Sequence, residues 1–181
     1  MVVNRSAPTG TIVPHLIYED VGAAIDWLCG AFGSKERLRA GGPDGQAGHA
    51  QLSIGDGAIV LGLARVGTGF ASPDRVEFRP PRPNEVSQSL SVRVDDVDRH
   101  FAHAKQFGAR ILSPPTDYPF GERQYTAEDL AGHRWTFSQS IADVDPQEWG
   151  AIVVKLEYCE RRKERGNRAS PNLQKRIDLS N

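Results

Sequence analysis

The sequence predicts an α+β fold made of two copies of one unit, each a strand, a helix and three further strands. Two matching motifs indicate the repeat: Tyr18-Glu-Asp20-Val21 with Phe32-Gly33 corresponds to Val94-Asp-Asp96-Val97 with Phe107-Gly108, at offsets of 76 and 75 residues. The glycine reversals at Gly57 and Gly132 are also 75 residues apart. Landmarks that recur with one period indicate an internal repeat. The copies are expected over residues 11–64 and 88–140, with a linker over 65–87.

The first copy begins with a predicted strand over residues 11–18. Asp20 follows it and suits a helix N-cap, because its carboxylate can accept from the free N–H groups of the first turn. Apolar residues then recur at helical spacing, which predicts one face packed on a sheet; they are Val21, Ala24, Ile25, Leu28 and Phe32. Gly33 can adopt the left-handed backbone conformation that ends a helix. Three more strands are expected, over residues 34–40, 49–54 and 58–64.

The second copy repeats this order, with a strand over 88–94, a helix capped by Asp96 and a strand over 110–113. A loop rich in aromatic residues follows over 114–121, and a hairpin with strands 123–127 and 133–137 completes the copy. Side chains alternate along a strand. On the last strand this places Trp135 and Phe137 on one face, and Arg134, Thr136 and Ser138 on the other.

Composition limits the class of protein. The chain has 181 residues, of which 39% are hydrophobic, so it can bury one substantial core. No apolar run approaches the roughly 20 residues that cross a bilayer, and we expect a cytoplasmic protein with no membrane contact. Cys29 and Cys159 lie far apart, which favours reduced thiols over a disulfide framework.

The C-terminal part, residues 141–181, is predicted to be a partly disordered extension. Residues 155–181 carry eight Lys or Arg against four acids, in a chain whose net charge is −1. A basic tail can contact nucleic acid, but this one lacks interleaved aromatic residues and any binding motif. No nucleic-acid partner is therefore expected. Residues 152–158 are compatible with a strand or with a helical turn.

Three motifs resemble those of the vicinal oxygen chelate superfamily, which includes glyoxalase I, extradiol dioxygenases, fosfomycin-resistance enzymes and bleomycin-binding resistance proteins. They are Glu19-Asp20-Val-x-Ala-Ala-Ile-Asp26-Trp27, Phe120-Gly121-Glu-Arg123 and Asp129-Leu-Ala-Gly132-His133-Arg134. The resemblance covers residues 11–140 and is closest to the glyoxalase or bleomycin-resistance-like branch. It implies two βαβββ repeats forming a curled mixed sheet with a concave cavity, and a homodimer.

In metal-dependent members of that superfamily, four strand positions bind one divalent ion. The resemblance places these positions at Val13, Leu61, Ser89 and Thr136, all expected to point into one concavity. Two apolar side chains and two hydroxyls cannot hold such an ion, so no metal or other cofactor is expected. No catalytic residue is assigned; His15, two residues past Val13, is the candidate. His100 and His103 are expected on the water-facing side of their helix.

The predicted function is metal-free binding of a small aromatic or amphipathic molecule in a cavity at a dimer interface. The candidate ligand-binding residues are His15, Tyr118, Phe120, Arg123, Tyr125, Arg134 and Thr136. The alternative is an enzyme of the same superfamily. It would be a lyase or isomerase acting on a 2-oxoaldehyde-type adduct, or a dioxygenase with a metal outside the aligned positions, using His15 with Glu77 or Glu128. Arg123 could instead pair with Glu122 or Glu128 at the surface.

Overall fold

The computed structural model describes residues 4–8, 10–41, 45–68 and 75–153. The chain divides into two compact units, Met1–Asp143 and Val144–Asn181. The first unit ends three residues beyond the expected boundary at residue 140. The described part of the second contains one 3₁₀ turn, Pro146–Trp149, which begins at the cap Asp145. Among the described residues, no helix has the length and apolar character needed to cross a membrane.

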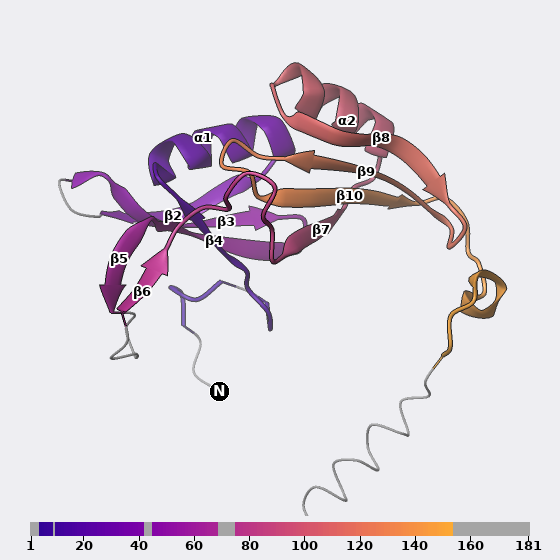
Figure 1. The fold of residues 1–181 in the computed structure, drawn as a ribbon, viewed down its shortest axis with the longest axis horizontal. Helices are drawn as coiled ribbons and strands as arrows, with labels where there is room; N and C mark the ends of the chain where they lie inside the picture. The colour runs from indigo at the N-terminus through magenta and orange to yellow at the C-terminus, as the bar shows by residue number, and fades with distance from the viewer. Residues whose placement is uncertain (1–3, 9, 42–44, 69–74, 154–181) are drawn as a thin grey trace, which may run out of the picture. The chain divides into compact units, whose positions relative to one another are not determined.

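The first repeat forms one mixed sheet in the order β1-β4-β3-β2 (Figure 1). Its elements are β1 (His15–Tyr18), α1 (Val21–Phe32), β2 (Lys35–Gly41), β3 (Ala47–Ile54) and β4 (Gly57–Leu63). β1 runs parallel to β4, with His15 opposite Val60 and Leu16 opposite Leu61. β3 is antiparallel to both β4 and β2.

The second repeat forms the corresponding sheet in the order β7-β10-β9-β8. It contains β7 (Ser89–Arg93), α2 (Val97–Gln106), β8 (Arg110–Tyr118), β9 (Glu122–Glu128) and β10 (Arg134–Ser140). β7 is parallel to β10, and β9 is antiparallel to both β10 and β8. The predicted α+β fold of two βαβββ repeats is therefore confirmed.

Both helices begin where the sequence predicted. Asp20 Oδ1 accepts from the N–H of Ala23 at 2.9 Å, and Asp96 Oδ1 accepts from the N–H of Arg99 at 2.9 Å. Gly33 ends α1 in the left-handed conformation, with φ of 70°. Each carboxylate satisfies a donor of the first turn that has no partner inside the helix, which fixes the point where strand gives way to helix.

Two segments differ from the expectation. The linker contains a hairpin of β5 (Arg65–Thr68) and β6 (Arg75–Phe78). β8 continues to Tyr118, although a loop was expected after Ser113, and its pairing with β9 shifts register between Ile111 and Thr116. β8 is an edge strand. An edge strand tolerates the missing N–H groups of Pro114 and Pro115, whereas a central strand would not.

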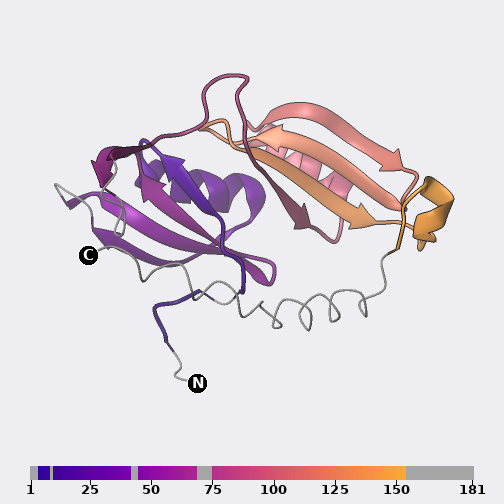
Figure 2. The ribbon, with the colours of Figure 1, turned by 60° about the horizontal axis from the view of Figure 1, so that its bottom comes forward.

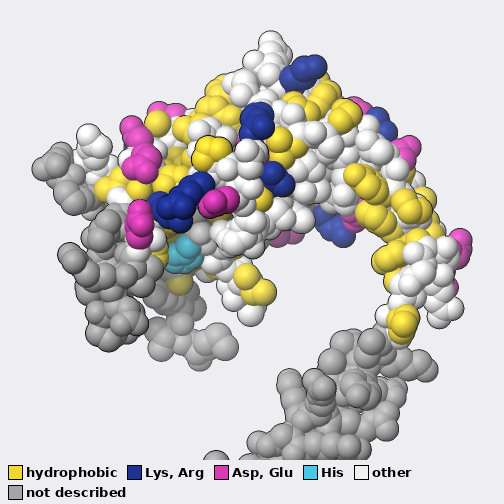
Figure 3. All heavy atoms as spheres, in the orientation of Figure 1, with side chains coloured by type: hydrophobic (Ala, Val, Ile, Leu, Met, Phe, Trp, Pro, Cys, Tyr) yellow, Lys and Arg dark blue, Asp and Glu magenta, His cyan; other side chains and the backbone are white. Residues whose placement is uncertain are grey.

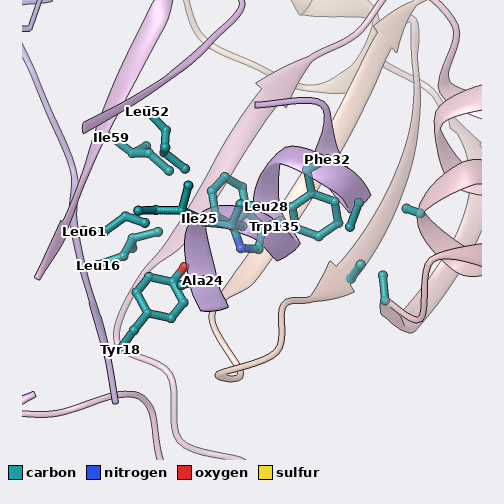
Figure 4. Close-up of a cluster of buried hydrophobic side chains, with 14 of the residues drawn as sticks. Leu16, Tyr18, Ala24, Ile25, Leu28, Phe32, Leu52, Ile59, Leu61 and Trp135 are labelled. Carbon is teal, nitrogen blue, oxygen red and sulfur yellow. The ribbon is translucent and has the colours of Figure 1, made fainter. Parts of the chain in front are cut away.

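The helices share one face of the two sheets, here called the helix-covered face, and the hydrophobic core lies beneath them (Figure 2). Phe32 of α1 contacts Phe137 and Trp135 of the second sheet, with ring centroids 4.8 Å and 5.3 Å apart. Figure 4 shows Leu16, Leu61, Ile25 and Leu28 meeting in the same cluster as Trp135. One core therefore joins the two repeats.

The expectation that both side chains face water was wrong for His100, which is half-buried, whereas His103 is exposed; both imidazoles contact α1. His103 Nε2 lies 2.6 Å from Gly30 O, and His100 Nε2 lies 3.4 Å from Phe32 O. Carbonyl groups in the last turn of a helix have no partner within that helix, so the two imidazoles occupy free acceptors at the end of α1. They hold the two helices together.

Candidate functional site

The side of each sheet away from the helices is called the helix-free face, and in the second sheet it is polar. Trp135 and Phe137 are fully buried on the helix-covered face, so their neighbours on β10 lie on the other face. The register adds residues from β7 and β9 to this polar surface, which comprises Ser89, Ser91, Arg93, Gln124, Thr126, Arg134, Thr136 and Ser138. Hydroxyl, amide and guanidinium groups thus line one sheet face.

Glu128 and its two arginines lie at one end of this polar face. Glu128 is 8% exposed. It accepts a hydrogen bond from Arg110, and its Oε1 lies 3.5 Å from Arg134 Nε. Arg134 Nε is buried and makes no hydrogen bond to the part of the chain that the structure describes. A buried donor without a hydrogen-bond partner is rare in native structures and calls for an explanation, such as a bound water or ion.

Two cavities are lined in part by the segment 79–88, which joins the two repeats. The larger, about 590 Å³, is lined by His15, Ile17 and His133 together with linker residues. The smaller, about 250 Å³, is lined by Arg110, Glu128, Arg134 and the β9–β10 reversal. His133 Nε2 lies 2.9 Å from Ile17 O, so this imidazole has a structural bond inside the larger cavity.

Tyr118 and Phe120 stack on each other at the end of β8, with ring centroids 5.3 Å apart and ring planes at 21°. Tyr118 pairs with Glu122, which lies on the helix-free face. In Figure 3, hydrophobic side chains gather over the ends of β8 to β10, where Tyr118 and Ile141 are both partly exposed. An aromatic surface thus adjoins the polar one.

The structure brings Arg134 and Thr136 together on the helix-free face and places His15 in the larger cavity. Two other candidates were wrongly assigned, because they lie on the helix-covered side. Tyr125 is fully buried, its hydroxyl is 2.6 Å from His100 Nδ1, and burial raises the pKa of its phenol. Arg123 bonds to Asp98 at 3.0 Å and to Asp117 at 2.6 Å. These carboxylates, Asp98 foremost, raise the pKa of its guanidinium.

The assignment of Leu61 to the family's metal position was also wrong. Leu61 is fully buried in the core opposite Leu16, whereas Val60 and Gly62 occupy the helix-free face. Ser89 and Thr136 lie on the helix-free face as expected, and Val13 precedes β1. With Val60 or Gly62 in place of Leu61, the set still lacks any carboxylate, imidazole or thiolate. These residues do not fit a divalent ion.

Side chains that could bind a metal are not clustered elsewhere in the described part of the chain either. Within residues 4–8, 10–41, 45–68 and 75–153, no three His, Cys, Asp or Glu side chains lie close enough to hold an ion. His15 lines the larger cavity and Glu128 the smaller, and Glu77 lines neither. The pairing of His15 with Glu77 or Glu128 is therefore not assembled in one cavity, whereas Glu85 lines the larger cavity together with His15.

One pair of hydrogen-bonding side chains was missed by the sequence analysis. Arg37 and Gln51 both reach the helix-free face of the first sheet, where they bond to each other and to the backbone of residues 5–7. The register shift that redirects Arg37 lies between Glu36 and Leu38. The sequence carries no signal for this shift, because residues 35–41 lack a regular alternation of apolar and polar side chains.

Known relatives share this architecture. TioX from Micromonospora sp. ML1, a solved structure, is 32% identical, with a TM-score of 0.56 over 73% of this chain and 99% of that one. A glyoxalase/bleomycin resistance protein/dioxygenase from Nocardioides is 18% identical, with a TM-score of 0.55 over 82% of this chain and 93% of that one, and shows the fold alone.

Sequence relatives agree with the structural ones. An uncharacterized protein of Mycobacterium tuberculosis (strain ATCC 25618 / H37Rv) is 30% identical over 143 residues, which cover 77% of this chain and 80% of the relative. The model of the Glyoxalase/Bleomycin resistance protein/Dioxygenase superfamily matches residues 10–137, which include both repeats. The chain therefore belongs to the Glyoxalase/Bleomycin resistance protein/Dioxygenase superfamily.

Proposed function

We propose that this protein binds a small aromatic or amphipathic molecule on the helix-free face of the second sheet, without a divalent ion. The observation that carries the proposal is Arg134 on the polar, helix-free face: its buried Nε makes no hydrogen bond in the described chain and has only an ion pair with Glu128 Oε1, at 3.5 Å. A ligand acceptor at this point would satisfy the donor and offset the cost of its burial. The neighbouring stack of Tyr118 and Phe120 supplies an aromatic surface.

We propose further that a second copy closes the site in a homodimer. The four strands β1, β2, β7 and β8 each end a sheet. An exposed strand edge carries unpaired N–H and C=O groups, and a partner subunit is one common way to cover it. A cavity shared by two copies would also enclose more of an amphipathic ligand than one open sheet face can.

A thermal-shift screen of aromatic antibiotics and metabolites, with and without divalent ions, tests the proposal. A compound that stabilises the protein equally with EDTA and with metal is the expected result. Its affinity should fall about tenfold in Arg134→Gln, because one charge-assisted hydrogen bond is lost. Arg99→Gln is the matched control, since Arg99 is exposed on α2. Binding that requires added metal, or that is unchanged in Arg134→Gln, would refute the proposed site.

The enzyme alternative makes a different prediction. If the protein is a lyase or isomerase that uses His15 as an acid or base, turnover of a 2-oxoaldehyde adduct should fall in His15→Asn. The small-molecule-binding proposal predicts no turnover by the natural chain or by His15→Asn. His15 is exposed, so this substitution should leave the fold intact.

A further inference from the structure

Residues 4–8, called the leader here, lie against the helix-free face of the first sheet, on the side opposite α1 (Figure 1). Two side chains of that sheet hold it by its backbone. Arg37 Nη2 donates to Arg5 O at 2.5 Å and to Ala7 O at 3.0 Å, and Gln51 Nε2 donates to Ser6 O at 3.0 Å. Three consecutive peptide carbonyls are therefore bound by one pair of side chains.

The local structure of β2 directs Arg37 to this face. Glu36 pairs with Leu52 and Leu38 pairs with Gln51, so Arg37 is an extra residue in β2, at a bulge. A bulge redirects a side chain and interrupts the regular alternation of a strand. Arg37 Nη1 consequently donates to Gln51 Oε1.

The pair can recognise only hydrogen-bond acceptors. A guanidinium has five donors and no acceptor, and the one acceptor of the Gln51 side chain is already bonded to Arg37. Gln51 is 6% exposed, so its amide is fixed in place. No acidic residue in the described ranges forms an ion pair with Arg37. The oxygens that suit the pair are amide carbonyls or carboxylates.

The leader is folded so that it presents its carbonyls. Asn4 Oδ1 accepts from the N–H of Ser6 at 3.0 Å, and Asn4 O accepts from the N–H of Ala7 at 3.2 Å. No side chain of residues 4–7 belongs to the core cluster, and the bonds to Arg37 and Gln51 use backbone atoms alone. Another peptide backbone would therefore meet the same pair of donors.

We propose that Arg37 and Gln51 form a subsite for the amide carbonyls of a peptidic ligand, and that the leader is its tethered occupant in the free protein. The ligand class rests on the proposed small-molecule-binding function, which it narrows. A free ligand must displace the leader, so its apparent dissociation constant is the intrinsic constant divided by the fraction of molecules in which the leader is detached. Loosening the leader should tighten binding of the free ligand, while removing Arg37 should weaken it.

The test uses the full-length chain and the probe N-acetyl-Arg-Ser-Ala-N-methylamide, which carries the three carbonyls of the leader. Binding is followed by NMR through the side-chain NH₂ signal of Gln51. Asn4→Ala removes the side-chain bond to Ser6, one of the two bonds that shape the leader. We expect this variant to bind the probe about fivefold more tightly than the natural chain. In the Asn4→Ala background, Arg37→Ala should weaken binding about tenfold or more.

Arg39→Ala is the matched control, because Arg39 lies on the same strand but bonds to Glu36; it should bind as the Asn4→Ala parent does. Arg37→Lys keeps the charge but loses the planar fork of donors; it should also weaken binding, and it replaces Arg37→Ala if that variant does not fold. Equal affinity in the natural chain and Asn4→Ala, or binding that survives both Arg37 substitutions, would overturn the proposal.

The two proposals fail separately. Arg134 belongs to the site on the second sheet, so Arg134→Gln should not change binding of the probe. Probe binding that depends on Arg134 and not on Arg37 would refute the subsite and leave the proposed function standing. If the protein binds the probe through Arg37 but binds no compound of the thermal-shift screen, the subsite stands and the proposed function is refuted.

Discussion

Tyr18 Oη donates a hydrogen bond of 2.7 Å to Asp129 Oδ2, and both residues are buried. The bond joins the first strand of the first repeat to the reversal between β9 and β10 of the second. Asp129 also accepts from Trp135 Nε1 at 3.1 Å and from the N–H groups of Ala131 and His133 at 2.9 and 3.0 Å. Burial, and then the adjacent carboxylate, raise the pKa of the Tyr18 phenol well above its usual value, which keeps it a donor.

Tyr18→Phe should lower the free energy of unfolding by about 1–3 kcal/mol, because it leaves a buried carboxylate short of one donor. Urea unfolding at neutral pH measures the change. Tyr118→Phe is the control, since Tyr118 is 37% exposed, and it should stay within about 0.5 kcal/mol of the natural chain. Equal effects of the two substitutions would show that the Tyr18–Asp129 bond does not couple the repeats.

Gly132→Ala should destabilise the protein by about 1–3 kcal/mol, because Gly132 has a φ of 90°, where a Cβ is strained. The space around it is open, with no atom within 4 Å of an added Cβ, so a loss would come from the backbone. Thermal and urea unfolding give the size of the loss. Gly41→Ala, also open but without a positive φ, should be nearly neutral. An unchanged stability in Gly132→Ala would argue against this turn geometry.

Acid should weaken the contact between the helices through His100. Burial, and to a lesser degree the nearby His103, lower the pKa of His100 in the folded protein, while Tyr125 Oη can donate to its neutral Nδ1. A lowered pKa means that this stabilisation is complete above the unfolded-state pKa of about 6.5 and is lost as pH falls through the folded value. Unfolding free energies measured from pH 8 to pH 5 should decline accordingly.

His100→Asn should flatten that decline, because asparagine does not titrate. His15→Asn should keep the decline, since His15 is exposed and is not among the hydrogen-bond partners of His100. If the free energy of unfolding of His100→Asn falls with acid as steeply as that of the natural chain, the pH dependence does not arise from His100.

The sequence identified the elements that depend on local chemistry. Asp20 and Asp96 cap their helices as predicted, because a cap requires only one side chain and the next few N–H groups. The face of Leu61 could not be found in this way. β4 has the sequence Gly-Ala-Ile-Val-Leu-Gly-Leu, and Ala58 to Leu61 are all buried. A strand without alternating apolar and polar residues does not show which of its side chains face the core. Pairing with β1 decides the face, and pairing is a long-range property.

The subsite on the first sheet escaped prediction for a related reason. Its occupant is recognised through the carbonyls of Arg5, Ser6 and Ala7, and every residue type has a carbonyl. Arg37 reaches the face only because β2 has a bulge. Neither feature leaves a side-chain pattern in the sequence, whereas the polar positions Arg134 and Thr136 were found from the regular alternation of β10.

The central claim, ligand binding without a divalent ion, is tested most directly by equilibrium dialysis of the untagged protein against Ni²⁺, Zn²⁺ and Mn²⁺, followed by elemental analysis. The account predicts no stoichiometric retention of any of these ions and a melting temperature changed by no more than about 1–2 °C, because an ion that does not bind the native state cannot stabilise it. One tightly held equivalent in the natural protein, lost in His15→Asn, would contradict the account.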